Sequence, residues 1–193
     1  MNPIIRPVPR LIGKTLEMRD ARERDAAFIL SLRTDPQKSR HLSPVSALLE
    51  DQRAWLRHYA VGQGQAYFIL WHAGLPIGTV RLYDGRGDSF CWGSWILIDS
   101  RPRHAAVESA LMVYAFALDH LGFARTHFDV RAGNARVRAF HERMGAVQTG
   151  QDGEDVLYKI DPDALLRARA GLRDFLPNGV RIADAAAVAD DLP

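Results

Sequence analysis

The sequence predicts an α+β (mixed α/β) domain with a central mixed, mostly antiparallel sheet of about seven strands flanked by helices. Three observations lead to this prediction. Three β-like runs follow one another through short turns rich in Gly and Asp. A helical segment then stands alone between two β-like runs, and another helix precedes a final pair of β-like runs.

The first third of the chain predicts one strand and two helices. Residues 1–10 carry three prolines and predict a loosely attached arm, and residues 11–19 predict a strand with a turn or bulge at Gly-Lys. Asp20 followed by Glu23 is a candidate capping box for a helix that an Asp-Pro pair ends. After a polar loop, apolar residues return at helical spacing in residues 46–59.

The middle of the chain predicts an antiparallel meander followed by a crossover. The β-like runs at residues 66–71, 77–83 and 89–98 are joined by HAGLP and DGRGD, whose Gly and Asp residues suit hairpin turns. A helix at residues 101–121 then leads to a strand at 126–131. Because a single helix joins these last two strands, the fourth and fifth strands should run parallel.

The last part of the chain predicts a capped helix and a hairpin. Asn134 is a suitable N-cap for a helix that runs to residue 144, and residues 146–150 and 156–160 predict the hairpin. A further helix is expected at residues 163–175.

These elements suit one domain over residues 1–176. Residues 177–193 are rich in Ala and Asp and predict a weakly attached tail.

Composition excludes several classes of protein. Apolar residues make up 47% of the chain and charged residues 25%, which is typical of soluble proteins. The net charge is +2 and no block of basic residues occurs, so no nucleic-acid partner is expected. Cys91 is the one cysteine, so neither a disulfide framework nor a Cys-rich zinc site is expected, and we expect no metal. No apolar run is long enough for a membrane span or a signal peptide, so we expect no membrane partner and a cytoplasmic location.

Two segments contain most of the residues from which we predict the function of the chain. Residues 101–106 read Arg-Pro-Arg-His-Ala-Ala at the start of the lone helix, and residues 134–145 read NARVRAFHERMG. Together with the order of elements over residues 11–160, they resemble the GNAT superfamily of N-acetyltransferases, in its ribosomal-protein and amino-sugar branches. The resemblance implies a GNAT-like acyl-CoA N-acyltransferase fold that uses acetyl-CoA and releases coenzyme A.

Residues 101–106 resemble the family segment Gln/Arg-x-x-Gly-x-Gly/Ala, which holds the coenzyme pyrophosphate. The physical basis is that the start of a helix offers unpaired N–H donors and a favourable dipole to an anion. A histidine stands where the family has its first glycine. The resemblance implies cofactor contacts by Arg101, Arg103, His104, Ala105 and Ala106.

The strand before this helix also resembles the family. Gly-Ser-Trp-Ile at residues 93–96 looks like the family's fourth strand, whose end pairs with the pantetheine arm and polarises the thioester carbonyl. The resemblance implies cofactor contacts by Ile96, Leu97 and Ile98. Strict alternation along this strand places Trp92 and Trp95 on opposite faces of the sheet.

The second segment supplies the candidate general acid. Asn134 and Gly145 match the family's asparagine and glycine, and His141 stands at the family's tyrosine position. The resemblance implies that Asn134 contacts the coenzyme and that His141 protonates the departing thiolate, helped by an unperturbed histidine pKa of about 6.5. Spacing alone favours a hydrogen-bonded core histidine on an apolar helix face.

The implied reaction is direct attack of a neutral amine on the thioester, assisted by backbone donors. Asp84, Asp88, Glu108 and a water chain near Ser94 are all open as the group that deprotonates the amine. Loop residues 33–45 contain several cationic side chains that suit an anionic small-molecule acceptor, such as a nucleotide-linked amino sugar, although a solvated loop is an equal reading. A protein N-terminus or other peptide amine is the alternative acceptor.

Substrate contacts are expected from Arg33, Trp92 and Ser94, and core packing is an alternative role for Trp92. Exposed strand edges also allow a homodimer. A non-catalytic acyl-CoA-binding or protein-interaction module on the same fold is the competing function, supported by the two histidine substitutions. A nucleotide-binding oxidoreductase is set aside because no Gly-x-Gly-x-x-Gly turn follows a strand.

Overall fold

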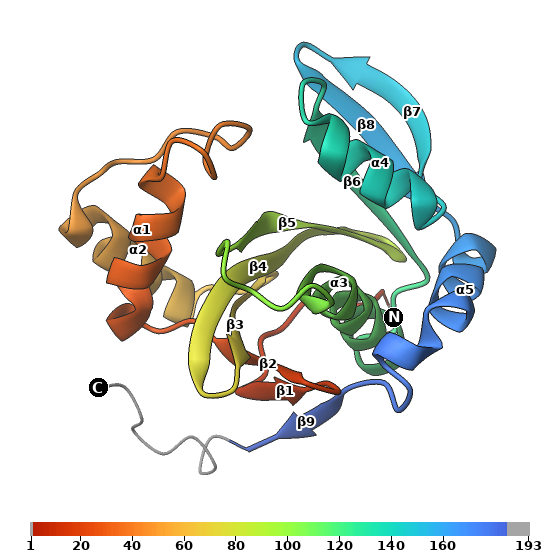
Figure 1. Ribbon diagram of the computed structural model, residues 1–193, viewed down its shortest axis with the longest axis horizontal. Helices are drawn as coiled ribbons and strands as arrows, with labels where there is room; N and C mark the ends of the chain where they lie inside the picture. Colours follow the sequence, from red (N-terminus) through yellow and green to blue (C-terminus); the bar gives the residue numbers. More distant parts are fainter. Residues whose placement is uncertain (1, 185–193) are drawn as a thin grey trace.

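The computed structural model describes residues 2–184, which form one nine-stranded sheet in the order β7-β8-β6-β5-β4-β3-β2-β1-β9 (Figure 1). The strands are β1 (Arg10–Ile12), β2 (Leu16–Asp20), β3 (Ala66–His72), β4 (Leu75–Arg86), β5 (Ser89–Leu97), β6 (Arg125–Arg131), β7 (Val147–Asp152), β8 (Asp155–Ile160) and β9 (Arg181–Ala183). The helices are α1 (Ala26–Thr34), α2 (Leu49–Val61), α3 (Ala105–Ala115), α4 (Ala135–Arg143) and α5 (Pro162–Gly171), with short helical turns η1 (Glu23–Asp25), η2 (Phe116–His120) and η3 (Arg173–Phe175). The predicted fold class is confirmed. None of the helices in residues 2–184 is long and apolar enough to cross a membrane.

The predicted meander and crossover are also confirmed. Strands β3, β4 and β5 pair antiparallel in sequence order, and β5 pairs parallel with β6 across the crossover helix α3. The β7–β8 hairpin continues the sheet beside β6 in antiparallel fashion. The α-helix predicted at residues 101–121 is shorter. Helix α3 begins at Ala105 and ends at Ala115, and the π-helical turn η2 follows it directly.

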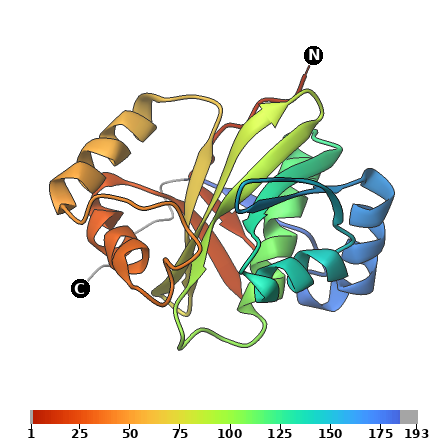
Figure 2. The same cartoon turned by 90° about the horizontal axis from the view of Figure 1, so that it is seen from above.

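Helices cover both faces of the sheet. Helices α1 and α2 lie on one face, and α3, α4 and α5 lie on the other (Figure 2). Strand β3 contributes to both cores, because Phe68 and Leu70 belong to the apolar cluster around α3, whereas Ile69 and Trp71 belong to the cluster around α1 and α2. Burial on both faces explains why β3 reads as a continuous apolar run instead of an alternating one.

Both ends of the described chain are held more firmly than predicted. The strand expected at residues 11–19 is a hairpin of two strands, β1 and β2. Ile5, in the arm expected to be loose, is 2% exposed and lies in the core. Strand β9, in the expected tail, pairs with β1, which gives the outer edge of β1 a partner. These two additional strands explain nine strands in place of about seven; residues 185–193 of the tail lie outside the described part.

The start of the first helix differs from the predicted capping box. The side chain of Asp25 accepts a hydrogen bond from the Arg22 N–H at 2.7 Å, so this pair replaces Asp20 and Glu23 at the helix start. Asp20 instead accepts a hydrogen bond from the Tyr59 hydroxyl at 2.6 Å. Burial raises the pKa of Asp20. Its hydrogen bond with Tyr59 joins β2 to α2.

A buried carboxylate joins α3 to the β1–β2 turn. Glu108, in the first turn of α3, is 1% exposed and accepts hydrogen bonds from the Thr15 N–H at 2.6 Å, the Thr15 hydroxyl at 2.6 Å and the Leu16 N–H at 2.9 Å. The turn approaches α3 so closely that a Cβ on Gly13 would lie 2.9 Å from Glu108 Oε1. These contacts fix the position of the first turn of α3.

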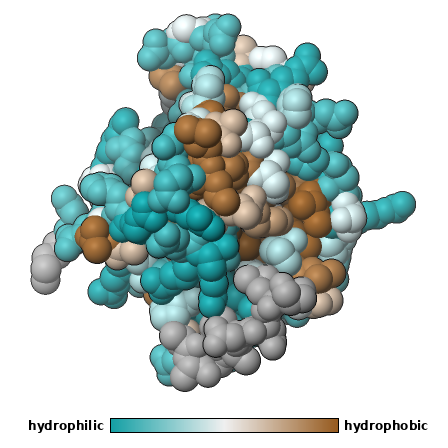
Figure 3. Space-filling view, turned by 90° about the vertical axis from the view of Figure 1, so that its left-hand side faces the viewer, coloured by the Kyte–Doolittle hydropathy of each residue, from teal (hydrophilic) through white to brown (hydrophobic). Residues whose placement is uncertain are grey.

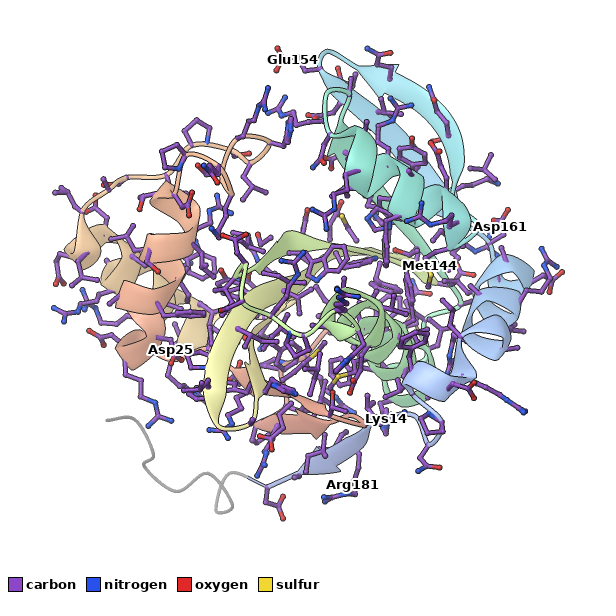
Figure 4. The ribbon with its side chains drawn as sticks, viewed as in Figure 1. Lys14, Asp25, Met144, Glu154, Asp161 and Arg181 are labelled. Carbon is purple, nitrogen blue, oxygen red and sulfur yellow. The ribbon has the colours of Figure 1, made fainter. Side chains whose placement is uncertain are left out.

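Glu108→Ala should destabilise the protein, because two backbone N–H groups lose their acceptor in a buried position. We expect the free energy of unfolding to fall by about 2–4 kcal/mol. The measurement is a lower urea midpoint at an unchanged m-value. Glu154→Ala is the matched control, because Glu154 lies at the tip of the β7–β8 hairpin (Figure 4) with a side chain 86% exposed. Equal midpoints for the two variants would contradict the assignment.

Candidate active site

A cleft opens where β5 and β6 part. The two strands pair only through Ser89 and Phe90 of β5, opposite Arg125 and Thr126 of β6, and then diverge (Figure 1). Strands β5 and β6, helix α4 and the loop after α1 form the walls of the cleft. Five of the predicted site residues line it: Arg33, Trp92, Ser94, Asn134 and His141. The structure therefore brings together residues that are more than one hundred positions apart in the sequence.

A β-bulge at Ser94 reshapes the wall formed by β5. Over this stretch β5 has one more residue than the paired part of β4, and Ser94 takes a φ of 47°. The extra residue turns Trp95 to the same face as Trp92, and their ring centroids lie 5.4 Å apart. The prediction that these tryptophans occupy opposite faces is therefore wrong, because strict alternation fails across a bulge.

His141 lies in the cleft within a group of aromatic rings. Its ring centroid is 4.3 Å from Phe128, 5.2 Å from Trp92, 5.5 Å from Phe140 and 6.3 Å from Trp95. The residue is 5% exposed, and its Nδ1 atom has no hydrogen-bond partner among the described residues. Burial lowers the pKa of His141 to about 4, so the ring is neutral at pH 7. The unperturbed pKa assumed from the sequence therefore does not apply to this buried ring.

Trp92 has a different environment from the one expected of a substrate contact. Its ring is 4% exposed and packs against His141 and against Tyr114 of α3, at centroid distances of 5.2 and 5.6 Å. It therefore forms the apolar wall behind His141, on the face opposite to α1 and α2.

At the end of β5, the backbone N–H and carbonyl of every second residue face the gap between β5 and β6. The Ile98 N–H donates to the Ile77 carbonyl of β4 at 2.9 Å. Backbone groups alternate in direction along an antiparallel strand, so the N–H and carbonyl of Ile96 also face β4, whereas those of Leu97 face the gap. Of the three residues predicted here, Leu97 is therefore the one whose backbone can pair with a ligand in the gap.

The segment before α3 places two arginines beside this gap. Arg101 Nη1 donates to the Ile98 carbonyl at 2.9 Å, and Arg103 is exposed. Ala105 is fully buried and Ala106 is half-buried, so these residues can offer an anion only their backbone N–H groups. The first turn of a helix supplies such donors together with a favourable dipole.

The side chain of His104 is engaged elsewhere. Its Nε2 atom lies 2.8 Å from the Thr15 hydroxyl and 3.7 Å from the Glu108 carboxylate. The ring thus extends the contact between α3 and the β1–β2 turn. The predicted contact of His104 with the coenzyme stays a prediction.

Asn134 and Arg33 enter the cleft from opposite sides. The predicted N-cap is confirmed, because Asn134 Oδ1 accepts a hydrogen bond from the Val137 N–H at 3.3 Å, which leaves the amide nitrogen as the group available to a ligand. Arg33, in the last turn of α1, donates from Nη2 to the Ser43 carbonyl at 2.9 Å, and its Nη1 atom lies 3.5 Å from Ser94 Oγ.

Three carboxylates left open as the general base are occupied in the structure. Asp84 pairs with Arg86 at 2.6 Å, Asp88 pairs with Arg125 at 3.1 Å, and Glu108 holds the β1–β2 turn. None of the three residues lines the cleft.

Sequence analysis missed Asp129 of β6 as a candidate base and Arg81 of β4 as a site residue. Asp129 lines the cleft, and partial desolvation followed by the nearby charge of Asp155 raises its pKa. Arg81 lines a second pocket beside Ser94. For Arg81 the available signal was a single charged residue within the apolar run TVRLY. For Asp129 it was the alternation of polar and apolar residues in HFDVR, which places His127, Asp129 and Arg131 on one face of the strand.

Nucleophilic and metal chemistry have little support in residues 2–184. Cys91 is 3% exposed, and burial raises the pKa of its thiol to about 12, which keeps it protonated. No group of three or more His, Cys, Asp or Glu side chains in this part of the chain is arranged to hold a metal ion.

Comparisons with known proteins can be set beside this geometry. A family model described as an acetyltransferase (GNAT) domain matches residues 15–147. Among solved structures, the apo form of FdhC, described as a nucleotide-linked sugar GNAT, has a TM-score of 0.76 and 37% sequence identity, over 86% of this chain and 98% of that chain. A putative acetyltransferase from T. thermophilus has a TM-score of 0.69 and 21% identity, over 88% of this chain and 100% of that chain. A search of curated proteins finds no match.

Burial of neutral His141 should make stability depend on pH. Its folded pKa of about 4 lies below the unfolded value of 6.5, so the folded protein binds fewer protons between these pH values. Stability should therefore fall as pH drops from about 6.5 to about 4, by on the order of 3 kcal/mol from this group. His141→Phe keeps an aromatic ring without the titration, so its urea midpoint should change less than that of the wild type between pH 7 and pH 4. Identical pH dependence in both proteins would show that this ring is not held in the neutral form.

Proposed function

This chain belongs to the GNAT acetyltransferase family, and from that premise we propose that it transfers an acetyl group from acetyl-CoA directly to a primary amine. The acceptor is a small molecule, such as a nucleotide-linked amino sugar, or a protein N-terminus. The observation that carries the proposal is the cleft between β5 and β6, in which an unpaired strand edge adjoins both a helix start and His141.

The coenzyme is proposed to bind along that edge. The backbone of Leu97 is oriented to pair with the pantetheine arm, as an added strand would. Arg101 and Arg103, with the N–H groups of Ala105 and Ala106, are positioned at the start of α3, where a pyrophosphate is favoured by both charge and dipole. Asn134 offers its amide nitrogen from the opposite wall. The acetyl group would then lie near Ser94 and His141.

The proposed reaction needs one proton to leave the amine and one to reach sulfur. The neutral amine attacks the thioester carbonyl, the C–N bond forms, and the C–S bond then breaks to release the coenzyme A thiolate. His141 is the proposed donor to that thiolate. Because burial keeps its ring neutral beforehand, the ring must first take up a proton, and the proton that the amine releases supplies it in the net reaction. Negative charge that develops on sulfur raises the pKa of the imidazolium and favours this uptake, after which the ring passes the proton to the thiolate.

Asp129 is the proposed acceptor of the amine proton. It lines the same cleft, and its raised pKa moves it closer to the value that suits a base near neutral pH. A water near Ser94 can carry the proton between the amine and this carboxylate.

Acetyl-CoA binding and turnover test the overall proposal. Titration calorimetry should detect acetyl-CoA binding, and a thiol-release assay with a panel of amines should detect turnover. Absence of acetyl-CoA binding at physiological concentration would contradict the enzyme proposal. Binding without thiol release for any amine would instead favour the non-catalytic acyl-CoA-binding module.

His141→Phe should lower kcat about 100-fold, which is the lower range for loss of a general acid, while acetyl-CoA binding changes little. The phenylalanine ring fills the same aromatic surroundings, so folding should be retained. Trp71→Phe is the control, because it alters a buried ring of β3 that does not line the cleft. Full activity in His141→Phe would disprove the general-acid assignment.

Asp129→Asn should lower kcat at neutral pH by a similar factor of about 100, because the amide cannot accept the amine proton. The loss should shrink as pH rises, since more of the acceptor amine is then already neutral. The measurement is the pH profile of kcat in both proteins. Asp51→Asn, on an exposed position of α2 outside the cleft, serves as the control. Parallel pH profiles for Asp129→Asn and the wild type would argue against a role for Asp129 as base.

A further inference from the structure

A second pocket adjoins the cleft on the side of α1 and α2. It shares Arg33 and Ser94 with the cleft, and its other lining residues are Ile29, Val45, Gln52, Trp55, Tyr67 and Arg81. On this side of the molecule, apolar surface lies between hydrophilic areas (Figure 3). Because the two pockets meet at Ser94, a ligand held in the second pocket can extend one end to the position where acetyl transfer is proposed.

Two guanidinium groups line this pocket without a carboxylate partner among residues 2–184. Arg33 contacts the Ser43 carbonyl and the Ser94 hydroxyl, and Arg81 donates to the Gln65 side-chain oxygen, so every protein partner is uncharged. The Nε atom of each arginine is buried and has no hydrogen-bond partner in the described chain. Both side chains are half-buried, and positive charge that is partly desolvated beside a pocket favours an anion there.

The surroundings of Arg81 orient its charge without neutralising it. Its guanidinium carbon lies 5.1 Å from the ring centroid of Trp55 and 5.1 Å from that of Tyr83. Such cation–π contacts offset part of the cost of desolvation and leave the net charge in place. Burial lowers the pKa of Arg81, and the positive charge of Arg33 lowers it further, so the two arginines act on each other.

We propose that Arg33 and Arg81 form an anion subsite that binds the diphosphate of a nucleotide-linked amino sugar and directs its amine past Ser94 into the cleft. The inference rests on the proposed function and adds the recognition element for the acceptor. The two guanidinium groups match the two negative charges of a diphosphate diester, one on each phosphate, whereas a carboxylate carries only one negative charge. Arginine also binds phosphate oxygens in pairs through its planar fork.

Kinetics with paired acceptors test the proposal. Thiol release is measured with a nucleoside-diphosphate-linked amino sugar and with the same amino sugar lacking the nucleotide. For the linked acceptor, Arg33→Met and Arg81→Met should each raise KM about tenfold to 100-fold, which corresponds to loss of a charge-assisted contact. For the free amino sugar, the fold loss in kcat/KM should be clearly smaller than for the linked acceptor. Arg53→Met on the outer side of α2, whose side chain is 47% exposed, is the matched control.

A binding measurement separates this proposal from the proposed function. UDP is titrated by calorimetry in the presence of saturating coenzyme A, so that the coenzyme site is blocked. UDP should bind the wild type and Arg53→Met equally, and about tenfold or more weakly to Arg33→Met and Arg81→Met. Acetate titrated in the same way should bind far more weakly than UDP.

The outcomes are distinct. UDP binding that depends on both arginines, without thiol release for any amine, supports the subsite and contradicts the acetyltransferase proposal. UDP affinity that is the same in all variants overturns the subsite even if turnover is found. Acetate binding as tight as UDP binding overturns the assignment to a diphosphate. Equal loss of activity toward linked and free acceptors in the two arginine variants also overturns the assignment to a diphosphate, because it indicates general damage to the cleft.

Discussion

Strands β5 and β6 share two residue pairs before they diverge, and the positions of the functional groups follow from that short contact. A longer pairing would close the gap and satisfy the backbone of Leu97 within the sheet. The early separation leaves that edge open and lets α4 bring His141 into the space. Because β5 stays bonded to β4 along its other edge on both sides of the bulge at Ser94, the open edge remains supported. The cleft is therefore a consequence of incomplete sheet formation at one defined position.

The bulge at Ser94 divides this cleft into two chemical environments. On the face of α3 and α4, the bulge brings Trp95 beside Trp92, and the resulting aromatic wall desolvates His141. On the face of α1 and α2, it places Ser94 next to Arg33. One side is thus apolar and lowers the pKa of His141, whereas the other side carries positive charge. A positive φ at a residue with a side chain is costly, and such local strain tends to persist at functional positions.

Local patterns in the sequence predicted most of the elements, and long-range contacts account for what they missed. Period-two and period-3.6 spacing located the meander, the crossover helix and the capped helix that begins after Asn134. No local pattern reports that Ile5 reaches the core, that β9 pairs with β1, or that Glu108 holds a turn more than ninety residues away. The family resemblance identified the position of His141, but its neutral state depends on rings contributed by β5, β6 and α4.

The pairing of β1 with β9 has a consequence for the order in which the protein is made. One neighbour of β1 follows it after a short turn, whereas the other belongs to the last described strand. During synthesis the outer edge of β1 therefore stays without its partner until almost the whole domain has emerged from the ribosome. Closing so long a loop adds little to the entropic cost, since that cost grows only logarithmically with length. The delay nevertheless exposes a strand edge for as long as translation lasts, which is the period in which a nascent chain is most prone to pair with the wrong partner.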